Sequence, residues 1–282
     1  MIGIITDSTC DIPESLIREY GIMVIPQLII WRDEQYRDRV DMQPEEFYQR
    51  LVSDKQYPTS SQAVIPDFVQ AYETMIEQGA TQIIILTVSS AMSGTYHRAL
   101  EASKLVPIPV SVIDSKGPTM TLGWQVLAAA RARNEGLDLQ GILKKVDQVR
   151  NRLVQFVCMD TLEYLQKGGR IGGAVKWVGS KLQVKPLVSI NHVTGLVEPI
   201  GLAMTHKKIV EMMYTKFFSL LDNSKPMHLA ILHGNVLAQA ENLAKRIQSE
   251  FHPVELIINM TGPVLGINTG PGALALCGYT EE

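Results

Sequence analysis

Short apolar runs alternate along the first half of the chain with longer segments in which apolar residues recur every three or four positions. The runs cover residues 3–6, 82–88 and 110–114, and the longer segments cover about 13–20, 65–78 and 93–103. The first pattern predicts strands and the second predicts helices. Because the strands are almost continuously apolar, they predict a largely parallel sheet with helices on both faces.

Residues that typically begin or end helices and strands refine this prediction. Asp11 and Glu14 match a capping box ahead of the first helix, and Gly21 would end it. Pro26 lies inside the apolar run 22–30, so that run is expected to be an edge strand or two short strands. A loop and a helix near 44–52 follow, and two long helices are predicted over 120–134 and 139–152.

The pattern changes character near residue 153. The runs 186–190 and 195–203 flank turn residues such as Asn191 and Gly195, which predicts a hairpin. Helices over 207–221 and 236–251 then alternate with strands near 228–234 and 254–260. We therefore expect an α/β protein with an N-terminal domain over 1–153 and a C-terminal α/β domain over 154–282.

Composition narrows the class of protein. Apolar residues make up 46% of the chain and charged residues 20%, as in ordinary globular proteins. The net charge of -3, without a run of five basic residues, argues against a nucleic-acid partner. Three widely spaced cysteines suggest neither a disulfide framework nor a zinc site. No basic leader or bilayer-spanning run is present, which predicts a cytoplasmic protein whose membrane contact, if any, is transient.

Polar residues follow most of the predicted strands, among them Asp7, Ser89, Asp114 and Thr261. In open α/β sheets ligands bind outside the carboxyl ends of the strands, so these residues mark a candidate binding edge. Helix capping explains each of them equally well when it is taken alone.

The stretch TVSSAMSGTYH, residues 87–97, concentrates hydroxyl groups. Ser93 and His97 stand four residues apart, the spacing of neighbours on a helix, but no acid is evident to orient the imidazole. The nucleophile elbow GxSxG is also absent, because Ala91 replaces its first glycine. The histidines show no metal-binding spacing. A catalytic serine is therefore the less favoured interpretation, and a metal site has no support.

Two glycine-rich stretches are candidates for ligand contact. KGGRIGG, residues 167–173, places Arg170 among glycines, which suits an anion or simply a solvated loop. TGPVLGINTGPGALAL, residues 261–276, contains Asn268 and Thr269 and is predicted to be a loop that approaches a ligand closely.

Seven stretches in the same order resemble the DegV family of bacterial fatty-acid-binding proteins, which includes the acyl-carrier subunits of fatty acid kinase. They span the chain from Ile4 to Leu276. They read IITDSTCDIP, SSQ, SSAMSGTY, VIDSK, LEYLQKGGRI, KPLVSI and TGPVLGINTGPGALAL.

The resemblance implies a two-domain fold that encloses an acyl chain in an apolar tunnel between or within its domains. By the same resemblance, Ser60 and Ser93 would hold the carboxylate, with Ser61, Asn268, Thr269 and Arg170 as further head-group or partner contacts. It implies a non-enzymatic carrier of a long-chain fatty acid, with no other cofactor and a fatty acid kinase catalytic subunit as partner.

Two positions depart from the family pattern. Asn268 stands where a histidine is common, and Met204 stands where an arginine is common. Both changes remove charge that we expect near the pocket mouth. A carrier of a neutral amphiphile therefore stays open as an alternative. A serine-dependent acyl hydrolase that uses the same hydroxyl groups is the other alternative. The oligomeric state is not determined by the sequence, although nothing in it suggests an interface.

Overall fold

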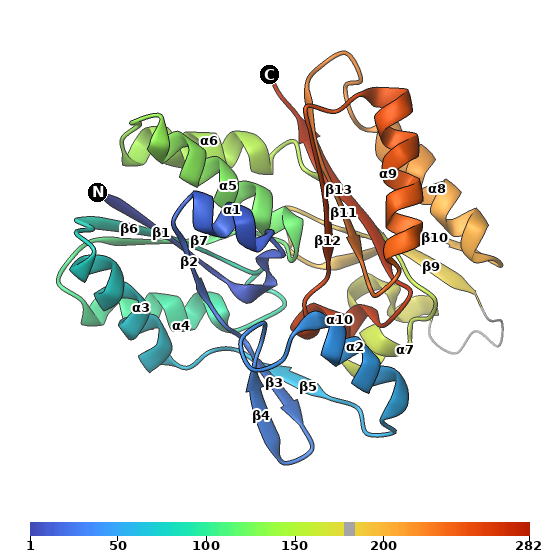
Figure 1. Ribbon diagram of the computed structural model, residues 1–282, viewed down its shortest axis with the longest axis horizontal. Coiled ribbons are helices and arrows are strands. Elements are labelled where there is room, and N and C mark those ends of the chain that lie inside the picture. Colours follow the sequence, from blue (N-terminus) through green and yellow to red (C-terminus); the bar gives the residue numbers. More distant parts are fainter. Residues whose placement is uncertain (178–183) are drawn as a thin grey trace.

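The computed structural model describes residues 1–177 and 184–282. Two sheets lie side by side with helices between and outside them (Figure 1). The first sheet has the order β2-β1-β6-β7, and all of its neighbouring strands are parallel. Its strands are β1 (Ile2–Asp7), β2 (Ile22–Ile25), β6 (Gln82–Thr87) and β7 (Val110–Asp114). The α/β class and the parallel sheet expected from the apolar runs are confirmed.

The second sheet has the order β10-β9-β8-β13-β11-β12. Only β11 and β12 are parallel neighbours in it, and β9 and β10 form the predicted hairpin. Its strands are β8 (Val154–Cys158), β9 (Lys185–Ile190), β10 (Val197–Ala203), β11 (Met227–His233), β12 (Glu255–Met260) and β13 (Leu274–Thr280).

A third, small antiparallel sheet was not predicted. It consists of β3 (Leu28–Trp31), β4 (Glu34–Arg37) and β5 (Thr59–Ser61) in the order β4-β3-β5. Pro26 separates β2 from β3, as expected for a residue that cannot donate to a ladder. The expected loop after β3 instead turns back as β4.

Helices lie between the two large sheets and cover their outer faces. The helix α5 (Met120–Asn134) lies between the two large sheets, and 11 of its 15 residues are buried, as expected for a helix that is apolar on most of its surface. The outer face of the first sheet is covered by α3 (Ile65–Glu77) and α4 (Thr95–Ala102). The outer face of the second is covered by α8 (His206–Ser219) and α9 (Leu237–Phe251).

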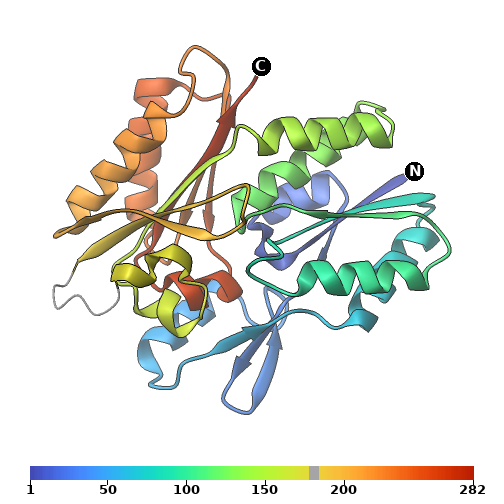
Figure 2. The ribbon, with the colours of Figure 1, turned by 180° about the vertical axis from the view of Figure 1, so that it is seen from behind.

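The remaining helices frame these layers. Three helices lie near the third sheet, at the lower end of the view (Figures 1 and 2): α2 (Pro44–Ser53), α7 (Glu163–Lys167) and α10 (Pro263–Thr269). The helices α1 (Glu14–Glu19) and α6 (Leu139–Arg150) pack against the core around α5. Short 3-10 turns cover Ser8–Cys10, Ser103–Leu105 and Gly172–Trp177.

Two local predictions were wrong. Asp11 does not cap α1, which begins after Pro13 without a side-chain cap. Asp11 instead adopts a left-handed conformation with φ of 50°, and its carboxylate binds other segments. The stretch 261–276 is not a loop either, because α10 occupies its centre and β13 its end.

The strands of the first and third sheets all precede residue 153, and those of the second sheet all follow it. Contacts between the two halves cross that point, among them the core around α5, which includes residues of both large sheets, and the packing of α10 against α2. The division into domains 1–153 and 154–282 stays a prediction. Within the described residues, no helix combines the length and hydropathy needed to cross a membrane.

Candidate functional site

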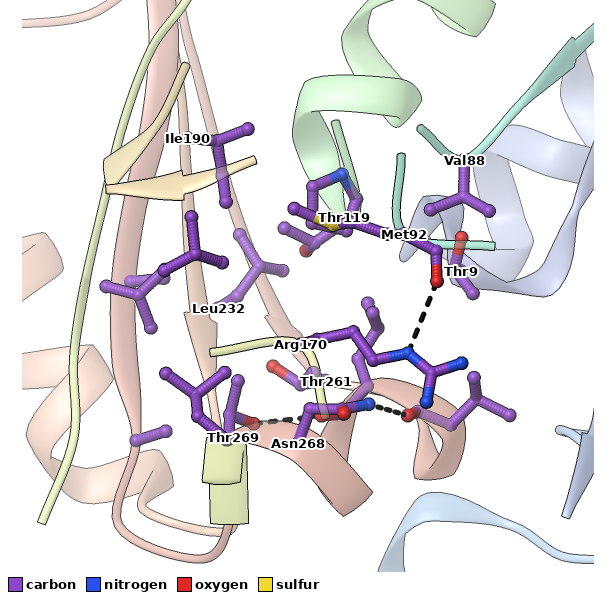
Figure 3. Close-up of a pocket in the computed structure, with 18 of the residues that line it drawn as sticks. Thr9, Val88, Met92, Thr119, Arg170, Ile190, Leu232, Thr261, Asn268 and Thr269 are labelled. Carbon is purple, nitrogen blue, oxygen red and sulfur yellow. Dashed lines mark hydrogen bonds between the residues drawn. The ribbon is translucent and has the colours of Figure 1, made fainter. Parts of the chain in front are cut away.

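A pocket lies where the carboxyl edge of the first sheet, the third sheet and α10 meet the inner face of the second sheet (Figure 3). Its volume is about 110 Å³, on a measure in which one water molecule needs roughly 10–15 Å³. The pocket therefore has room for a ligand of many atoms.

One wall of the pocket is apolar and comes largely from the second sheet. Its residues are Val157, Met159, Val188, Ile190, Val197, Leu232, Leu274 and Ala275. In Figure 3, Ile190 lies at the side of the pocket opposite to Asn268 and Thr269. The pocket thus has an apolar side on the sheet and a more polar side near α10.

All six residues singled out from the sequence line this one pocket. They are Ser60, Ser61, Ser93, Arg170, Asn268 and Thr269. Ser60 and Ser61 lie on β5, Ser93 precedes α4, Arg170 follows α7, and Asn268 and Thr269 end α10. Residues more than 200 positions apart in the sequence are therefore brought together.

The hydroxyl-rich stretch 87–97 divides into structural and pocket-facing groups. Ser89 Oγ donates to the carbonyl of Gly195 at 2.9 Å, which ties the end of β6 to the β9–β10 hairpin. Ser90 Oγ donates to the Asp114 carboxylate at the end of β7. Of the three serines in this stretch, only Ser93 lines the pocket.

Ser93 belongs to a chain of hydrogen bonds that sets the direction of its hydroxyl. Its Oγ accepts from the backbone N–H of Thr95 at 3.3 Å and lies 2.8 Å from Thr95 Oγ1. Gln27 Nε2 donates to the same Thr95 Oγ1 at 3.0 Å. The Thr95 hydroxyl keeps its own hydrogen, which can point to Ser93 Oγ; in that arrangement the Ser93 hydrogen is free to donate to a ligand.

Gln27 also connects the two serine-bearing segments. Its side chain is buried, and its Oε1 accepts from the backbone N–H of Ala63 at 3.1 Å, directly after β5. Its backbone N–H donates to Ser8 Oγ at 3.0 Å. One glutamine thereby fixes the segment of Ser60 relative to that of Ser93.

Arg170 is the only charged side chain among the described residues that line the pocket. Its Nε donates to the carbonyl of Met92 at 3.2 Å (Figure 3). Its Nη1 donates to the carbonyl of Gly168 at 2.6 Å. These two bonds use part of its five N–H donors. The guanidinium is held at the pocket and keeps donors for an anionic group.

Asn268 and Thr269 are partly committed to their own helix. Asn268 Nδ2 donates to the carbonyl of Val264 at 3.0 Å, and Thr269 Oγ1 donates to that of Leu265 at 3.2 Å. Asn268 Oδ1 is buried and has no partner within the described residues. At this position the pocket offers an acceptor rather than a positive charge.

Comparisons with known proteins identify the family of this chain. A protein-family model described as DegV family matches residues 1–281. The chain belongs to the DegV family. It is 32% identical over 282 residues to a DegV domain-containing protein of Halalkalibacterium halodurans, covering 100% of this chain and 99% of that one.

Solved structures of DegV proteins share the fold. A structure described as fatty acid binding of a DegV family protein from Thermus thermophilus matches with a TM-score of 0.91 and 29% identity, and covers 99% of both chains. A stearic acid-binding protein from Eubacterium ventriosum matches with a TM-score of 0.90 and 25% identity, covering 99% of this chain and 98% of that one.

The two departures from the usual DegV pattern lie in different places. Asn268 lines the pocket, whereas Met204 is exposed and is not among the lining residues. The expectation that both remove charge near the pocket mouth was therefore wrong for Met204. Only the change at Asn268 bears on the pocket itself.

The catalytic pair considered for Ser93 is not assembled. His97 is exposed and its ring contacts Tyr96, whereas Ser93 bonds Thr95. No histidine occurs among the lining residues of the described chain. The same part of the chain contains no group of three His, Cys, Asp or Glu side chains that could hold a metal ion.

Sequence reasoning did not assign a role to several polar lining residues: Gln27, Gln62, Thr119 and Gln155. Thr9 also lines the pocket, and it belongs to the polar residues that follow the predicted strands. Its position depends on Asp7, whose buried carboxylate accepts from the Thr9 backbone N–H at 3.0 Å and from that of Val88 at 2.8 Å. Burial raises the pKa of Asp7, and these hydrogen bonds oppose the shift.

Proposed function

We propose that this DegV protein binds one long-chain fatty acid in the pocket as a carrier rather than an enzyme. The carboxylate lies at the polar side, where Ser60, Ser93 and Arg170 donate to it. The acyl chain lies along the apolar wall of the second sheet. The observation that carries the proposal is the lining itself, in which one charged residue among those described, the cation Arg170, lies beside hydroxyl groups at one side of an otherwise largely apolar cavity.

The chemistry of the ligand explains this lining. An ionised carboxylate removed from water needs donors, and hydrogen bonds to charged groups contribute roughly 1.5–3 kcal/mol each. The acyl chain contributes more, because burial of a methylene is worth about 0.8 kcal/mol and a chain of ~14 methylenes gives around 11 kcal/mol before the cost of ordering. The chain thus provides most of the affinity and the polar groups orient the ligand.

Relatives support this assignment. The Thermus thermophilus and Eubacterium ventriosum structures, which share the fold over nearly the whole chain, are described as fatty-acid-binding and stearic acid-binding proteins. A carrier also agrees with the Ser93 hydrogen-bond chain, which presents a donor and contains no base. The presentation of the carboxylate to a kinase subunit is part of the same hypothesis, and the exposed Arg170 is the residue at which such a partner would meet the head group.

The first experiment is to identify the molecule that co-purifies with the protein. The purified protein is denatured, extracted into organic solvent and analysed by mass spectrometry. One equivalent of a long-chain fatty acid is the expected result. A neutral lipid would favour the alternative suggested by Asn268, and an empty protein that binds no added fatty acid would overturn the proposal.

A further inference from the structure

Gln155 is a polar residue in the apolar wall of the pocket. It lies on β8 with Val157, and Met159 directly follows the strand; all three residues line the pocket. Met159 leads on toward α7 and Arg170. Four residue steps of extended chain separate Met159 from Gln155, or roughly 13 Å. Gln155 is therefore far from the proposed carboxylate site.

The side chain of Gln155 is buried with one end unsatisfied. The residue is 1% exposed, and its Nε2 has no hydrogen-bond partner within the described residues. Its Oε1 accepts from Thr121 Oγ1 on α5. A buried amide donor without an acceptor is unfavourable, so such a group in a ligand pocket points to an acceptor in the ligand.

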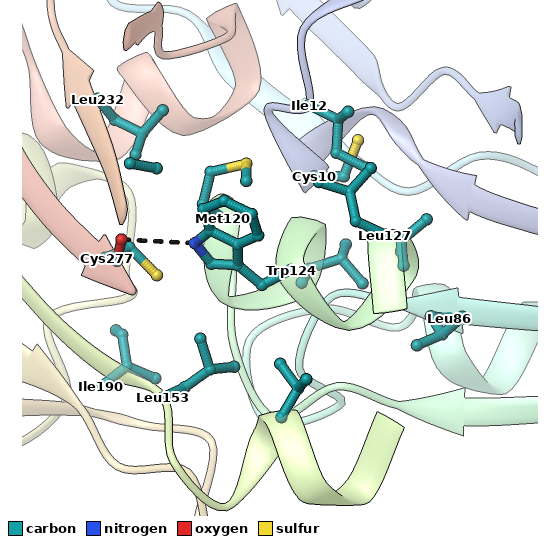
Figure 4. Packing of buried hydrophobic residues seen from close by; sticks show 14 of the residues in the cluster. Cys10, Ile12, Leu86, Met120, Trp124, Leu127, Leu153, Ile190, Leu232 and Cys277 are labelled. Atoms are coloured by element: carbon teal, nitrogen blue, oxygen red, sulfur yellow. Dashed lines mark hydrogen bonds between the residues drawn. The ribbon is translucent and has the colours of Figure 1, made fainter. Parts of the chain in front are cut away.

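The groups around Thr121 form a chain of hydrogen bonds in which Nε2 of the amide has no part. Thr121 Oγ1 lies 3.7 Å from Cys277 Sγ, and Cys277 is the partner of Gln155 across the β8–β13 ladder. Figure 4 shows Cys277 on β13 facing α5. Burial raises the pKa of Cys277 to about 12, so its thiol stays protonated and can donate to Thr121. The Thr121 hydroxyl then donates to Gln155 Oε1, and Nε2 is left as the unused donor.

We propose that Gln155 is a second recognition point and that the preferred ligand is a long-chain fatty acid with a hydroxyl or carbonyl oxygen in the distal part of its chain. This inference rests on the proposed fatty-acid binding. A distal oxygen would accept from Gln155 Nε2, whereas a plain alkyl chain leaves that donor without a partner. Because β8 and Thr121 hold the amide, the preference depends on where the oxygen lies along the chain.

The wild-type protein provides the first test. Stearic acid and a series of hydroxystearic acids, with the hydroxyl moved from the carbon beside the carboxylate into the distal half, compete with a fluorescent fatty acid. We expect one distal isomer to bind about tenfold more tightly than stearic acid, and the proximal isomer to show no such gain. If no distal isomer binds more tightly than stearic acid, the inference fails although the proposed function stands. If no acid in the series binds, the proposed function itself fails.

Variants provide the second test. Gln155→Met keeps the length of the side chain and removes the donor, so the preference for the distal isomer should disappear and stearic acid should bind more tightly. Gln125→Met is the matched control, because Gln125 is a buried glutamine that also contacts Thr121 but does not line the pocket. A preference that survives in Gln155→Met overturns the inference. The inference is also overturned if stearic acid and the distal hydroxystearic acid bind equally tightly and a crystal structure with stearic acid shows a water molecule bound to Gln155 Nε2.

Discussion

At the scale of single residues, the pocket depends on the direction in which each polar group donates. Gln27 donates to Thr95, and the Thr95 backbone N–H donates to Ser93. The Ser93 hydroxyl is left as a donor, which suits an anion and gives no means of removing a proton from the serine. The same serine in a hydrolase would need a base within hydrogen-bond reach.

Replacement of Ser93 tests this assignment. Ser93→Ala removes one charge-assisted hydrogen bond and should weaken fatty-acid binding about tenfold to 150-fold. Displacement of a fluorescent fatty acid measures the affinity. Ser103→Ala is the control, because Ser103 bonds the carbonyl of Leu100 at the end of α4, away from the pocket. Equal affinity of Ser93→Ala and the wild type would remove Ser93 from the site.

Arg170 supplies the charge at the pocket. Arg170→Gln should lower affinity about tenfold and make binding less sensitive to salt, because the remaining contacts are neutral and salt screens an exposed cation. The measurement is the dissociation constant at low and high ionic strength. Lys167→Gln is the control, since Lys167 is a nearby cation that pairs with Glu163 and does not line the pocket. An unchanged salt dependence in Arg170→Gln would contradict the role given to this residue.

At the scale of elements, α10 positions the polar side of the pocket through its contact with α2. A Cβ on Gly266 would lie 2.6 Å from the Phe47 ring and 2.8 Å from Tyr48 Oη. Gly266→Ala should therefore push α10 away, destabilise the fold by roughly 1–3 kcal/mol and weaken ligand binding, because Asn268 and Thr269 move with the helix. Chemical denaturation and ligand titration measure the two effects.

Gly141→Ala in α6 is the control for this substitution. Gly141 lies in the first turn of α6, and its Cβ would meet Leu137 at 3.0 Å and the capping Asp138 Oδ1 at 3.2 Å, so the loss of stability should be smaller there than for Gly266→Ala. Binding should not change. A Gly266→Ala protein that binds as tightly as the wild type would show that the position of α10 is not critical.

The elements also show how far the sequence could predict the structure. The helix α5 matches its predicted range of residues 120–134, because a long apolar segment leaves little choice of conformation. The helix α10 was missed, because Gly262, Pro263 and Gly266 suggest a loop when the sequence is read locally. Packing on Phe47 and Tyr48, distant in sequence, stabilises the helix. Gln155 was missed for a similar reason, since only the fold shows that its amide lacks a partner.

At the scale of the whole molecule, one buried carboxylate joins segments from both halves of the chain. Asp11 Oδ1 accepts from Arg39 Nη2 at 2.7 Å and from the Gly262 backbone N–H at 2.9 Å, and Asp11 Oδ2 accepts from Thr119 Oγ1 at 2.7 Å. Arg39 Nη2 also donates to the carbonyl of Met260 at 2.9 Å. These bonds hold the beginnings of α5 and α10 together beside the pocket.

Asp38, next to Arg39, makes this junction sensitive to pH. Burial raises the pKa of Asp38 from 3.8 to about 7, although Arg39 and the hydrogen bond from Ser8 Oγ at 2.7 Å oppose the shift. The folded protein therefore binds this proton more tightly than the unfolded chain does. The stability that results is fully present below about pH 4 and is lost as the pH rises through 7.

Asp38→Asn removes this titration while it keeps an acceptor for Ser8. The melting temperature of the wild type should fall between pH 5 and pH 8 relative to that of the variant, whose profile should be flatter over the same interval. Burial raises the pKa of Asp7 as well, so part of the pH dependence should remain in Asp38→Asn. Parallel profiles for the two proteins would show that the Asp38 carboxyl does not titrate in this range. A flatter profile would show that neutralisation of Asp38 stabilises the folded protein.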